Sequence, residues 1–318
     1  MARAGHIRPA VSARALRIGL IIVTYDSVGV LAGCLGSLEA GSEGVDLADV
    51  VVVDNTSSDD SLRVAKEFNS RPVQTVQMGR NAGYAAGVNA GIGALDIGAL
   101  DAIMVMNPDT RLRAGSLAIL GQALNQPRRR YRGAEARVHP DGSLQLSLRR
   151  EPAIHRALAE SILGRAAARI GTLGELVGDP DAYEQAGEWA WATGAAMLMS
   201  PAMVAQVGKV GRSPFLLYSE ETDYMLRAAD HGWRLWYEPR AVVEHIGGGS
   251  ATNAMLASLI AINRVTLFRR RHGRAAAAAF SLSVLTGEGL RAIAGRRPSR
   301  AAFAALMQPS RRIRELPA

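Results

Sequence analysis

The segment RIGLIIVTY, at residues 17–25, is a short and continuous apolar run that ends in polar residues, a pattern typical of a buried β-strand. Three further runs of this kind follow: VVVVD (50–54), VQTVQM (73–78) and AIMVM (102–106). Apolar residues recur at helical spacing in the segments between and after these runs: 28–41, 59–69, 81–95 and 113–126. This alternation predicts an α/β fold, in which helices flank a mostly parallel sheet with right-handed crossovers.

The second half of the chain has shorter and less regular patterns. Helical composition is found at 153–177 and at 219–232. Short strands are expected at 194–200, 234–238 and 241–246. Two helices with apolar faces and basic ends are expected within 252–273 and 275–295, and the remaining segments 296–300 and 311–318 are expected to be frayed or bound to a surface.

The net charge of +8 is unevenly distributed along the sequence. Residues 264–318 contain twelve arginines and two acids, and residues 1–17 contain four arginines and no acid, so the remaining body is acidic. An acidic body argues against a protein that neutralises nucleic-acid phosphates, and we expect no nucleic-acid partner. Basic ends suit an anionic membrane surface; the alternative is an arginine-rich composition, since only Lys66 and Lys209 are lysines.

Cysteine usage and hydropathy set the expected compartment. Cys34 is the only cysteine, which excludes an internal disulfide and a cysteine-built zinc site and favours a reducing cytoplasm. No stretch reaches the ~20 apolar residues of a membrane-spanning helix. The basic start resembles a signal peptide, but TYDS follows the first apolar run without a small-residue cleavage pattern. We expect a cytoplasmic protein that associates peripherally with the inner face of the cell membrane.

Polar residues directly follow three of the predicted strands. In a parallel sheet, ligands bind beyond the carboxyl ends of the strands, so these residues are candidates for a binding site. They are Thr24, Tyr25 and Asp26, then Asp54 and Asn55, then Asn107 and Asp109. The carboxylate of Asp54 can accept a hydrogen bond from a pyrimidine N–H, whereas the adjacent NTSSDDS also suits helix capping without any ligand.

Asp109 and His245 are candidate metal ligands. A carboxylate on the rigid turn of NPD can hold a hard cation that bridges two phosphates; a simple Pro-Asp turn is the alternative. His245 ends AVVEH and can complete a metal site, although a lone histidine at a strand end is more often structural. The glycines at 247–249 allow a close approach of backbone to a phosphate, or only a flexible turn.

Three carboxylates, Glu220, Glu221 and Asp223, stand within four residues in YSEETDYMLRAADHG. Mutual repulsion raises the pKa of such groups, which suits a general base. Acids at a helix N-terminus also favour the helix dipole, and both interpretations are compatible. Together these residues provide the acids that transfer from a nucleotide sugar requires, namely a cation site for the diphosphate and a base for the attacking hydroxyl.

In this order, the segments resemble the family 2 glycosyltransferases with the GT-A fold, in particular their rhamnosyltransferase-like branch. The resemblance covers about residues 18–272 and rests on seven motifs: IIVTYDS, VVVDNTSSDDS, NAGYAAGVNAGI, MNPDT, WATGAAMLMSPAMVAQVG, FLLYSEETDYMLRAADHGWRLWYEPRAVVEHIGGGS and NRVTLFRRRHG. It implies an inverting enzyme that uses Mg²⁺ or Mn²⁺ to move a sugar from a nucleotide-diphosphate donor to a hydroxyl. The expected parts are a basic tail (1–16), a GT-A catalytic domain (17–250, with a donor half 17–125 and an acceptor half 126–250) and basic amphipathic helices (251–318).

The resemblance also implies a role for each matching residue. The nucleotide base would be lined by Thr24, Asp26 and Asp54, with Tyr25, Asn55 and Asn107 completing the donor site. The ribose and diphosphate would be approached by Asn81 and Gly83, and the metal would be held by Asp109 and His245. The acceptor would rest on Thr193 and Gly194 and stack on Trp191. Glu221 stands where the family has its catalytic aspartate, so we expect Asp54, Asp109, Glu221 and His245 to face one shared cavity.

Two positions depart from the pattern of the family. Asn107 replaces the first aspartate of the DXD-type motif, so metal binding is either weaker or rests on Asp109 and His245. Glu221 is one methylene longer than the usual aspartate, and a displacement of about 1 Å can cost ~10²-fold in rate. Either the pocket is adjusted to the longer side chain, or Asp223 or Glu220 shares the role of base.

Substrates are inferred from the branch and the basic end. Thymidine-diphosphate rhamnose is the favoured donor, and UDP-hexose donors (galactosyl, glucosyl or N-acetylglucosaminyl) are the alternative. The basic amphipathic end favours a lipid-linked saccharide or cell-envelope glycan as acceptor. A sugar nucleotidyltransferase would carry a glycine-rich loop with a basic residue after the first strand, where this chain has TYDSVGVL. A non-catalytic binder driven by the basic tail is the second alternative.

Overall fold

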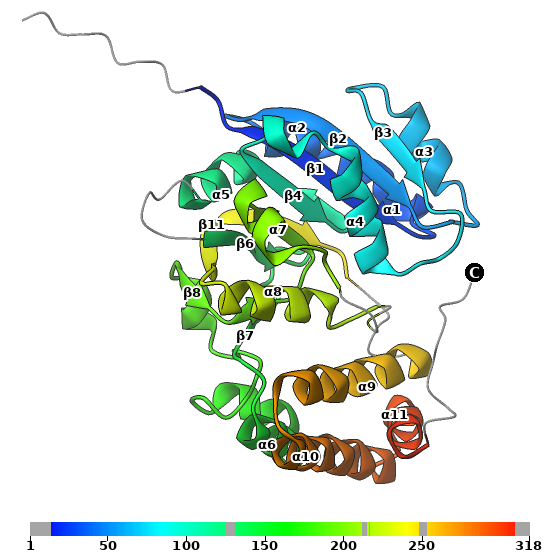
Figure 1. Ribbon diagram of the computed structural model, residues 1–318, viewed down its shortest axis with the longest axis vertical. Helices are drawn as coiled ribbons and strands as arrows, with labels where there is room; N and C mark the ends of the chain where they lie inside the picture. The colour runs from blue at the N-terminus through cyan, green and yellow to red at the C-terminus, as the bar shows by residue number, and fades with distance from the viewer. Residues whose placement is uncertain (1–13, 125–130, 212–214, 216, 248–252, 309–318) are drawn as a thin grey trace, which may run out of the picture.

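The computed structural model describes residues 14–124, 131–211, 215, 217–247 and 253–308, and it contains a central sheet with helices on both faces (Figure 1). The strands of the donor half pair in parallel. They are β1 (Arg17–Thr24), β2 (Asp46–Asp54), β3 (Gln74–Gln77) and β4 (Ala102–Met106), in the spatial order β3-β2-β1-β4. All four occur where the sequence predicts them. β1, β4 and the second half of β2 are continuous buried runs, whereas β3 is a shorter strand at the edge of the sheet whose side chains are exposed or half-buried.

The remaining strands of this sheet lie beyond β4; all but β5 come from the expected acceptor half. They are β5 (Thr110–Leu112), β6 (Tyr131–Val138), β8 (Gly187–Trp189), β10 (Ala196–Met199) and β11 (Arg234–His245). The spatial order continues β4-β10-β6-β11-β5, with β8 beside β11, and β10 runs antiparallel to β4. The result is a mixed, mostly parallel α/β sheet whose carboxyl-terminal strand ends β1, β2 and β4 lie side by side.

Successive side chains of a strand point to opposite faces of the sheet, and a hydrophobic core forms on each face. One core packs under α1 (Val28–Gly36), α2 (Leu38–Gly41), α3 (Ser61–Glu67) and α5 (Ser116–Leu124). The other packs under α4 (Tyr84–Ala94), α7 (Pro201–Val207) and α8 (Glu220–Asp230). In β1, Leu20 and Ile22 enter the first core whereas Ile21 and Val23 enter the second, as the period of two in a strand requires.

Glycines explain the close contact between α4 and β1. A Cβ atom at Gly87 would lie 2.6 Å from a methyl of Val23, and one at Gly91 would lie 2.4 Å from a methyl of Ile21. Only glycine allows the helix backbone to rest directly on these side chains. The close packing fixes the N-terminal end of α4 next to the carboxyl end of β1.

Two expectations for the acceptor half are wrong in detail. The segments expected as two strands at 234–238 and 241–246 form the single strand β11, with a bulge between Glu238 and Val242. Pro239 lies in this bulge, because proline has no N–H for a ladder. The expected helix at 153–177 is only α6 (Ile154–Leu163), which ends at Gly164 with a φ of +57° and continues as short 3-10 turns.

A second layer of helices lies below the sheet in Figure 1. It contains α6, α9 (Ala254–Arg271), α10 (Arg274–Ile293) and α11 (Arg297–Met307), packed around stacked Phe268 and Phe280. Fraying of residues 296–300 is wrong, because Pro298 occupies the first turn of α11, where its missing N–H costs nothing. Residues 1–13 and 311–318 lie outside the described residues. Since α6 belongs to the predicted 126–250 half yet packs on α10, the helical layer draws on both expected parts; the boundaries themselves stay a prediction.

None of the helices in the described part of the chain is both long and apolar enough to cross a bilayer.

Candidate active site

A first cavity of about 500 Å³ opens at the carboxyl ends of β1 and β4. Eight of the nine donor-site residues predicted from the sequence line it: Thr24, Tyr25, Asp26, Asn55, Asn81, Gly83, Asn107 and Asp109. Thr24 is fully buried, and its hydroxyl has no hydrogen-bond partner among the described residues. A buried hydroxyl of this kind on a cavity wall is suited to a polar ligand.

Side chains of the loop after β2 hold the loop after β1. The carboxylate of Asp26 accepts hydrogen bonds from the backbone N–H and hydroxyl of Ser58, at 2.7 and 3.1 Å. The carboxylate of Asp59 accepts from the backbone N–H groups of Val28 and Ser61, both at 2.9 Å. Asp26 and Asp59 therefore brace the cavity rim, and Asp59 links the two loops besides accepting from the first turn of α3.

Asp54 is the one predicted donor residue that does not line the cavity. It is buried, and both oxygens accept hydrogen bonds from Ser57, through the backbone N–H and the hydroxyl. Its carboxylate is therefore already used in shaping the loop behind Asn55. Its expected contact with the nucleotide base stays a prediction.

Asn55 and Asn81 form a clamp at the entrance to α4. The amide of Asn55 donates to Oδ1 of Asn81 at 2.7 Å and accepts from the backbone N–H of Ala82 at 3.0 Å. Gly83 precedes α4 with a φ of +86°, a conformation that favours glycine. The clamp thus fixes a helix N-terminus against the cavity, where backbone N–H groups suit a phosphate.

His245 lies beside Asp109, because β11 pairs with β5. In this register His245 is opposite Thr110, the residue after Asp109. The Nε2 of His245 is 3.4 Å from Oδ2 of Asp109, and its Nδ1 is 2.6 Å from Oε1 of Gln145. Burial opposes ionisation of Asp109, but hydrogen bonds and the charge of His245, together with a backbone N–H at Gly247, hold its pKa below the usual value.

Asp109 and His245 are the two residues that could hold a metal ion here. In the parts of the chain that the structure describes, no group of three or more acidic, histidine or cysteine side chains gathers around one point. Two protein ligands leave the remaining positions of a hard cation to phosphate oxygens and water, which is how Mg²⁺ is usually bound at phosphate sites. The carboxylate of Asp109 and the imidazole of His245, which Gln145 holds in place, therefore suit a divalent cation.

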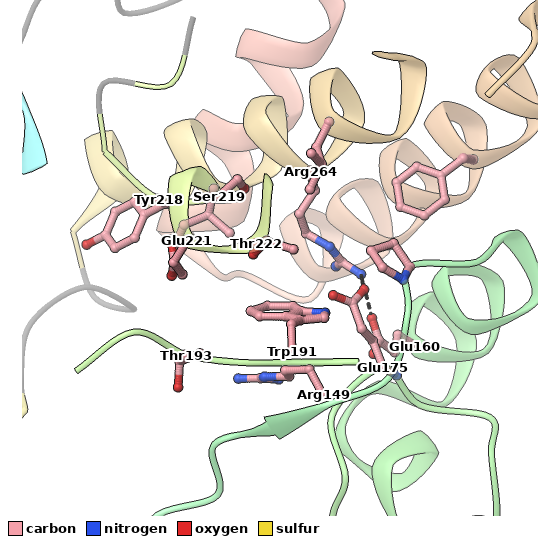
Figure 2. A pocket seen from close by; sticks show the side chains of 14 residues that line it. Arg149, Glu160, Glu175, Trp191, Thr193, Tyr218, Ser219, Glu221, Thr222 and Arg264 are labelled. Carbon is pink, nitrogen blue, oxygen red and sulfur yellow. Dashed lines mark hydrogen bonds and ion pairs between the residues drawn. The ribbon is translucent and has the colours of Figure 1, made fainter. Parts of the chain in front are cut away.

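A second cavity, of about 420 Å³, adjoins the first between α8, β7 (Leu148–Arg149), β9 (Trp191–Ala192) and the helical layer (Figure 2). It is lined by the predicted acceptor residues Trp191 and Thr193 and by Glu221. Tyr218 lines both cavities. The expectation that Asp54, Asp109, Glu221 and His245 face one shared cavity is therefore wrong. Asp109 lines the first cavity and Glu221 the second, His245 lies beside Asp109, and neither His245 nor Asp54 lines either cavity.

The three clustered carboxylates have different surroundings. Glu221 lines the second cavity. Asp223 is buried in an ion pair with Arg227 at 2.8 Å, and that arginine also donates to the carbonyls of Val207 and Lys209. Glu220 is 3% exposed; burial and the neighbouring charge of Glu221 raise its pKa well above the usual value. Since Asp223 and Glu220 lie off both cavity walls, only Glu221 of the three is placed to meet an acceptor.

Gly194 lies directly against the side chain of Glu221. A Cβ atom at Gly194 would lie 3.2 Å from the Cβ of Glu221. Gly194 does not itself line the cavity, and it acts by allowing Glu221 to approach the strand. Trp191 is fixed nearby by a hydrogen bond from its indole N–H to the carbonyl of Arg150 at 3.1 Å.

A strained turn joins the two cavities. Tyr218 and Ser219 have φ angles of +66° and +68°, which are unfavourable for residues other than glycine. The side-chain amide of Asn263, on α9, donates to the carbonyls of Leu217 and Tyr218 at 2.9 and 3.0 Å. The helical layer thereby holds the turn that positions Tyr218 and starts α8.

Sequence reasoning missed several residues of the site: Gln145, Arg149, Tyr218, Asn263 and Arg264. Gln145 and Arg149 lie in the irregular segment, where no periodic pattern marks an element. Tyr218 and Asn263 lie within two of the family motifs, in LLYSEE and NRVTLF. No sequence pattern reveals the positive φ of Tyr218 or the hydrogen bonds that Asn263 donates to this turn. Arginine in a basic end was interpreted as surface charge, whereas Arg264 is paired inside the second cavity.

Comparison with known proteins identifies a family for this site. The family model described as Glycosyl transferase family 2 matches residues 20–172. A curated protein of Mycobacterium tuberculosis, "N-acetylglucosaminyl-diphospho-decaprenol L-rhamnosyltransferase", is 30% identical over 241 residues, which are 71% of this chain and 75% of the relative.

Solved structures share the fold at low sequence identity. The mannosyltransferase PcManGT from Pyrobaculum calidifontis, solved with GDP-Man and Mn²⁺, has a TM-score of 0.53 at 15% identity and covers 95% of this chain and 82% of its own. GalNAc-T7, solved with UDP, GalNAc and Mn²⁺, has a TM-score of 0.58 at 14% identity and covers 80% of this chain and 48% of its own. These similarities show a GT-A fold.

Proposed function

This chain belongs to glycosyl transferase family 2, and from that membership we propose that it transfers rhamnose, with inversion, from thymidine-diphosphate rhamnose to a hydroxyl of a lipid-linked or cell-envelope glycan. The L-rhamnosyltransferase of M. tuberculosis supports the choice of sugar. The observation that carries the proposal is the pair of adjoining cavities, which share Tyr218 and have Asp109 on one wall and Glu221 on the other.

The first cavity is proposed as the donor site. Asn55, Asn81 and the N-terminus of α4 would hold the ribose and diphosphate, and the hydroxyl of Thr24 would meet the base. Asp109 and His245 would hold Mg²⁺ or Mn²⁺, which when bound stabilises the charge of the departing diphosphate. Asp54 would shape the loop that carries Asn55.

The second cavity is proposed as the acceptor site, with Glu221 as general base. Glu221 removes the proton of the acceptor hydroxyl, and the oxygen forms a bond to the anomeric carbon while the bond from that carbon to the diphosphate breaks on the opposite face. Trp191 would offer an aromatic face to the acceptor sugar, and Thr193 a hydroxyl. Glu220 and Asp223, which lie off the cavity, would keep structural roles.

An anionic membrane surface is proposed as the partner of the helical layer, at the cytoplasmic face of the cell membrane. Of the ten large apolar side chains that are exposed in the described residues, nine lie between Leu158 and Met307, on or next to helices of this layer. The most exposed are Ile162 on α6 and Leu282 and Ile293 on α10. Clustered exposure of this kind marks an interaction surface.

Arginines beside these apolar residues supply charge complementary to anionic lipid. Arg14 and Arg17 pair with Asp101 and Asp46, so the described part of the N-terminal tail contributes little free charge. In contrast, the helical layer contains exposed arginines with no acidic partner among the described residues: Arg165, Arg169, Arg274, Arg296, Arg297 and Arg300. Each basic side chain near lipid contributes on the order of 1 kcal/mol.

The donor assignment is tested by a thermal-shift panel of dTDP, UDP and GDP with and without Mn²⁺, followed by turnover of the matching sugar nucleotides. A ligand at 100 times its Kd stabilises the folded state by about 2.7 kcal/mol, so the true donor nucleotide raises the melting temperature measurably. We expect dTDP to give the largest shift and dTDP-rhamnose to be consumed. A panel in which no nucleoside diphosphate raises the melting temperature contradicts the donor site.

The base assignment is tested by Glu221→Gln with Glu220→Gln as a matched control. Loss of a general base costs about 10²–10⁴-fold in rate, so Glu221→Gln should lose transfer while keeping the thermal shift with donor nucleotide. Glu220→Gln, one residue away but off the cavity, should keep most of its turnover. Retained turnover in Glu221→Gln would show that another group takes the proton.

A further inference from the structure

Arg149 lies on the wall of the second cavity and is held there by a short sheet. It is the last residue of β7 and lies opposite Trp191 of β9 in the antiparallel register. The Cζ of its guanidinium is 5.7 Å from the centroid of the Trp191 ring. Figure 2 shows the indole between Arg149 on one side and the segment of α8 that carries Glu221 and Thr222 on the other.

The guanidinium of Arg149 has no directly paired acid in the described part of the chain. No carboxylate of the described residues forms an ion pair with it, and its Nε is buried without a hydrogen bond. Burial lowers the pKa of Arg149 below the ordinary value of arginine, because desolvation disfavours the charged form. Arginine nevertheless keeps its charge in proteins, so the cavity wall contains a desolvated cation with donors to spare.

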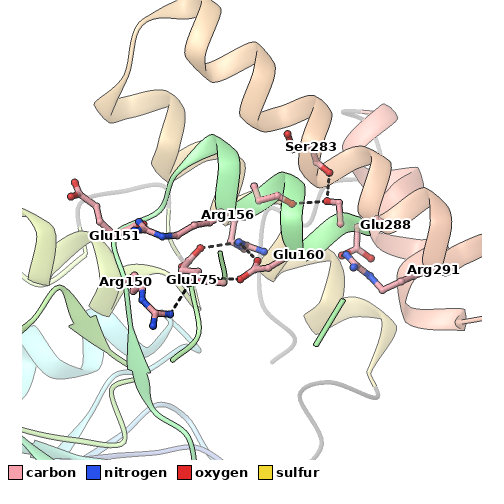
Figure 3. Close-up of polar contacts among 12 residues, drawn as sticks. Arg150, Glu151, Arg156, Glu160, Glu175, Ser283, Glu288 and Arg291 are labelled. Atoms are coloured by element: carbon pink, nitrogen blue, oxygen red, sulfur yellow. Dashed lines mark hydrogen bonds and ion pairs between the residues drawn. The ribbon is translucent and has the colours of Figure 1, made fainter. Parts of the chain in front are cut away.

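The acids closest to this cation are already paired with another arginine. Glu160 and Glu175 also line the cavity, but both pair with Arg264, at 2.9 and 2.8 Å. Burial opposes the charge of Arg264, yet the two carboxylates raise its pKa above the ordinary value. Figure 3 shows Glu160 and Glu175 converging, and the backbone N–H of Glu175 donates to Glu160 at 2.8 Å. The charges of both acids also act on Arg149 and oppose the effect of burial on its pKa. Among the described residues, however, neither carboxylate forms an ion pair with Arg149, so its guanidinium donors stay available to a ligand.

We propose that Arg149 binds a phosphate group of the acceptor. The proposal rests on the assignment of the second cavity to the acceptor and names the chemical class that this cavity selects: a sugar joined to its carrier through phosphate. Guanidinium is planar and presents paired donors, a geometry that matches phosphate oxygens. The sugar would stack on Trp191 near Glu221, and the phosphate would follow on the Arg149 side.

Donor phosphates do not explain Arg149. Asp109, His245 and the N-terminus of α4, the groups suited to a diphosphate and its cation, line or adjoin the first cavity, and Arg149 is not among the residues of that cavity. A cation–π contact with Trp191 is the remaining explanation. That contact requires a positive charge over the ring but predicts no preference for phosphate.

Equilibrium binding separates these explanations without any turnover. The probes are farnesyl diphosphate with farnesol, and N-acetylglucosamine 1-phosphate with N-acetylglucosamine, each titrated into the full-length protein with dTDP and Mn²⁺ present so that the first cavity is filled. We expect the wild type to prefer at least one phosphorylated probe over its neutral parent by about tenfold or more, which is the scale of one charge-assisted hydrogen-bond pair. A preference for the lipid probe indicates a lipid-linked phosphate, and one for the sugar probe a sugar phosphate.

Three variants complete the test. Arg149→Gln should remove the preference, Arg149→Lys should retain part of it, and Arg234→Gln, an exposed arginine at the start of β11, should leave it unchanged. Circular dichroism and melting temperature show whether each variant folds. The proposal is overturned when wild type shows no preference, or when Arg149→Gln weakens phosphorylated and neutral probes equally. Failure of the nucleotide panel with an intact Arg149-dependent preference would instead overturn the proposed donor.

Discussion

Gln145 orients His245 through a contact of 2.6 Å between its Oε1 and the imidazole Nδ1. Because an amide oxygen can only accept, Nδ1 carries the hydrogen and donates it. The other ring nitrogen, Nε2, is then directed at Asp109, 3.4 Å away. A partner that fixes the tautomer in this way is typical of metal-binding histidines, and Gln145 comes from a segment 100 residues earlier in the chain.

Gln145→Leu removes this acceptor and should weaken metal binding. Loss of a residue that orients a metal ligand typically costs 10–100-fold in metal affinity, so we expect the Mn²⁺ concentration for half-maximal transfer to rise about tenfold or more. Gln145→Glu is the matched control, because its carboxylate still accepts from Nδ1–H. Equal Mn²⁺ requirements in wild type and Gln145→Leu would show that His245 needs no such orientation.

Gly194→Ala tests how precisely Glu221 must be placed. The new methyl would lie 3.2 Å from the Cβ and 3.4 Å from the Cγ of Glu221, so the carboxylate has to shift by a few tenths of an ångström. Since a displacement of about 1 Å can cost ~10²-fold, we expect kcat to fall about tenfold, with a melting temperature close to that of wild type. Gly36→Ala, where no atom lies within 4 Å of the added methyl, is the control. Unchanged kcat in Gly194→Ala would indicate that the longer glutamate tolerates movement.

The donor half of the fold was predictable because three of its strands contain unbroken apolar runs. These runs located β1, β2 and β4, and the alternation of strands and helices then grouped the polar residues at their ends. In the acceptor half, β6 has the sequence YRGAEARV, which contains three charged residues and no apolar run. The sequence does not mark this segment as a central strand; only its pairing with β10 and β11 in the structure does.

Side-chain hydrogen bonds distinguish residues that the sequence treats alike. Asp54 and Asp223 are acids at the expected positions, but Ser57 satisfies the first and Arg227 pairs with the second. Which carboxylate stays available for chemistry depends on these local partners, and sequence spacing does not reveal them. Thr24 is the opposite case. Its hydroxyl has no hydrogen-bond partner among the described residues and is therefore available to a ligand.

Glu220→Gln should stabilise the protein at neutral pH and not in acid. The pKa of Glu220 is raised in the folded state, chiefly by burial and then by Glu221, so the folded form binds a proton that the unfolded form has lost. Wild-type stability is therefore complete below the unfolded pKa of about 4.3 and falls as pH rises through the folded value. Because glutamine cannot ionise, the Glu220→Gln variant does not lose stability in this way as the pH rises.

Melting temperatures of both proteins between pH 4 and pH 8 measure the effect of Glu220. We expect a difference of about 2 °C or more in favour of Glu220→Gln at pH 8, shrinking towards pH 4. Glu43→Gln, at an exposed position, should show no such trend. A difference that is constant over this range would mean that Glu220 is not held in its protonated form.

The apolar face of the helical layer should be required for membrane binding. Ile162, Leu282 and Ile293 are 66%, 64% and 85% exposed, so replacing all three by serine removes apolar contact with lipid and no core packing. Full burial of one such side chain contributes about 1.5–3 kcal/mol, and partial insertion of three is enough to reduce vesicle binding by about tenfold or more. Flotation with phosphatidylglycerol-containing vesicles measures the bound fraction, and Val28→Ser, an exposed apolar residue outside this layer, is the control.

Charge should act together with this apolar face. Arg296→Gln with Arg297→Gln, placed three and four residues after Ile293, should weaken binding to anionic vesicles by about 1 kcal/mol for each arginine and leave binding to neutral phosphatidylcholine vesicles unchanged. High salt should reproduce the effect of the arginine variant, because it screens charges near the surface, and should not reproduce that of the serine variant. Co-flotation of the serine variant at the level of wild type would mean that these side chains face water, and that the helical layer meets its acceptor without lying on lipid.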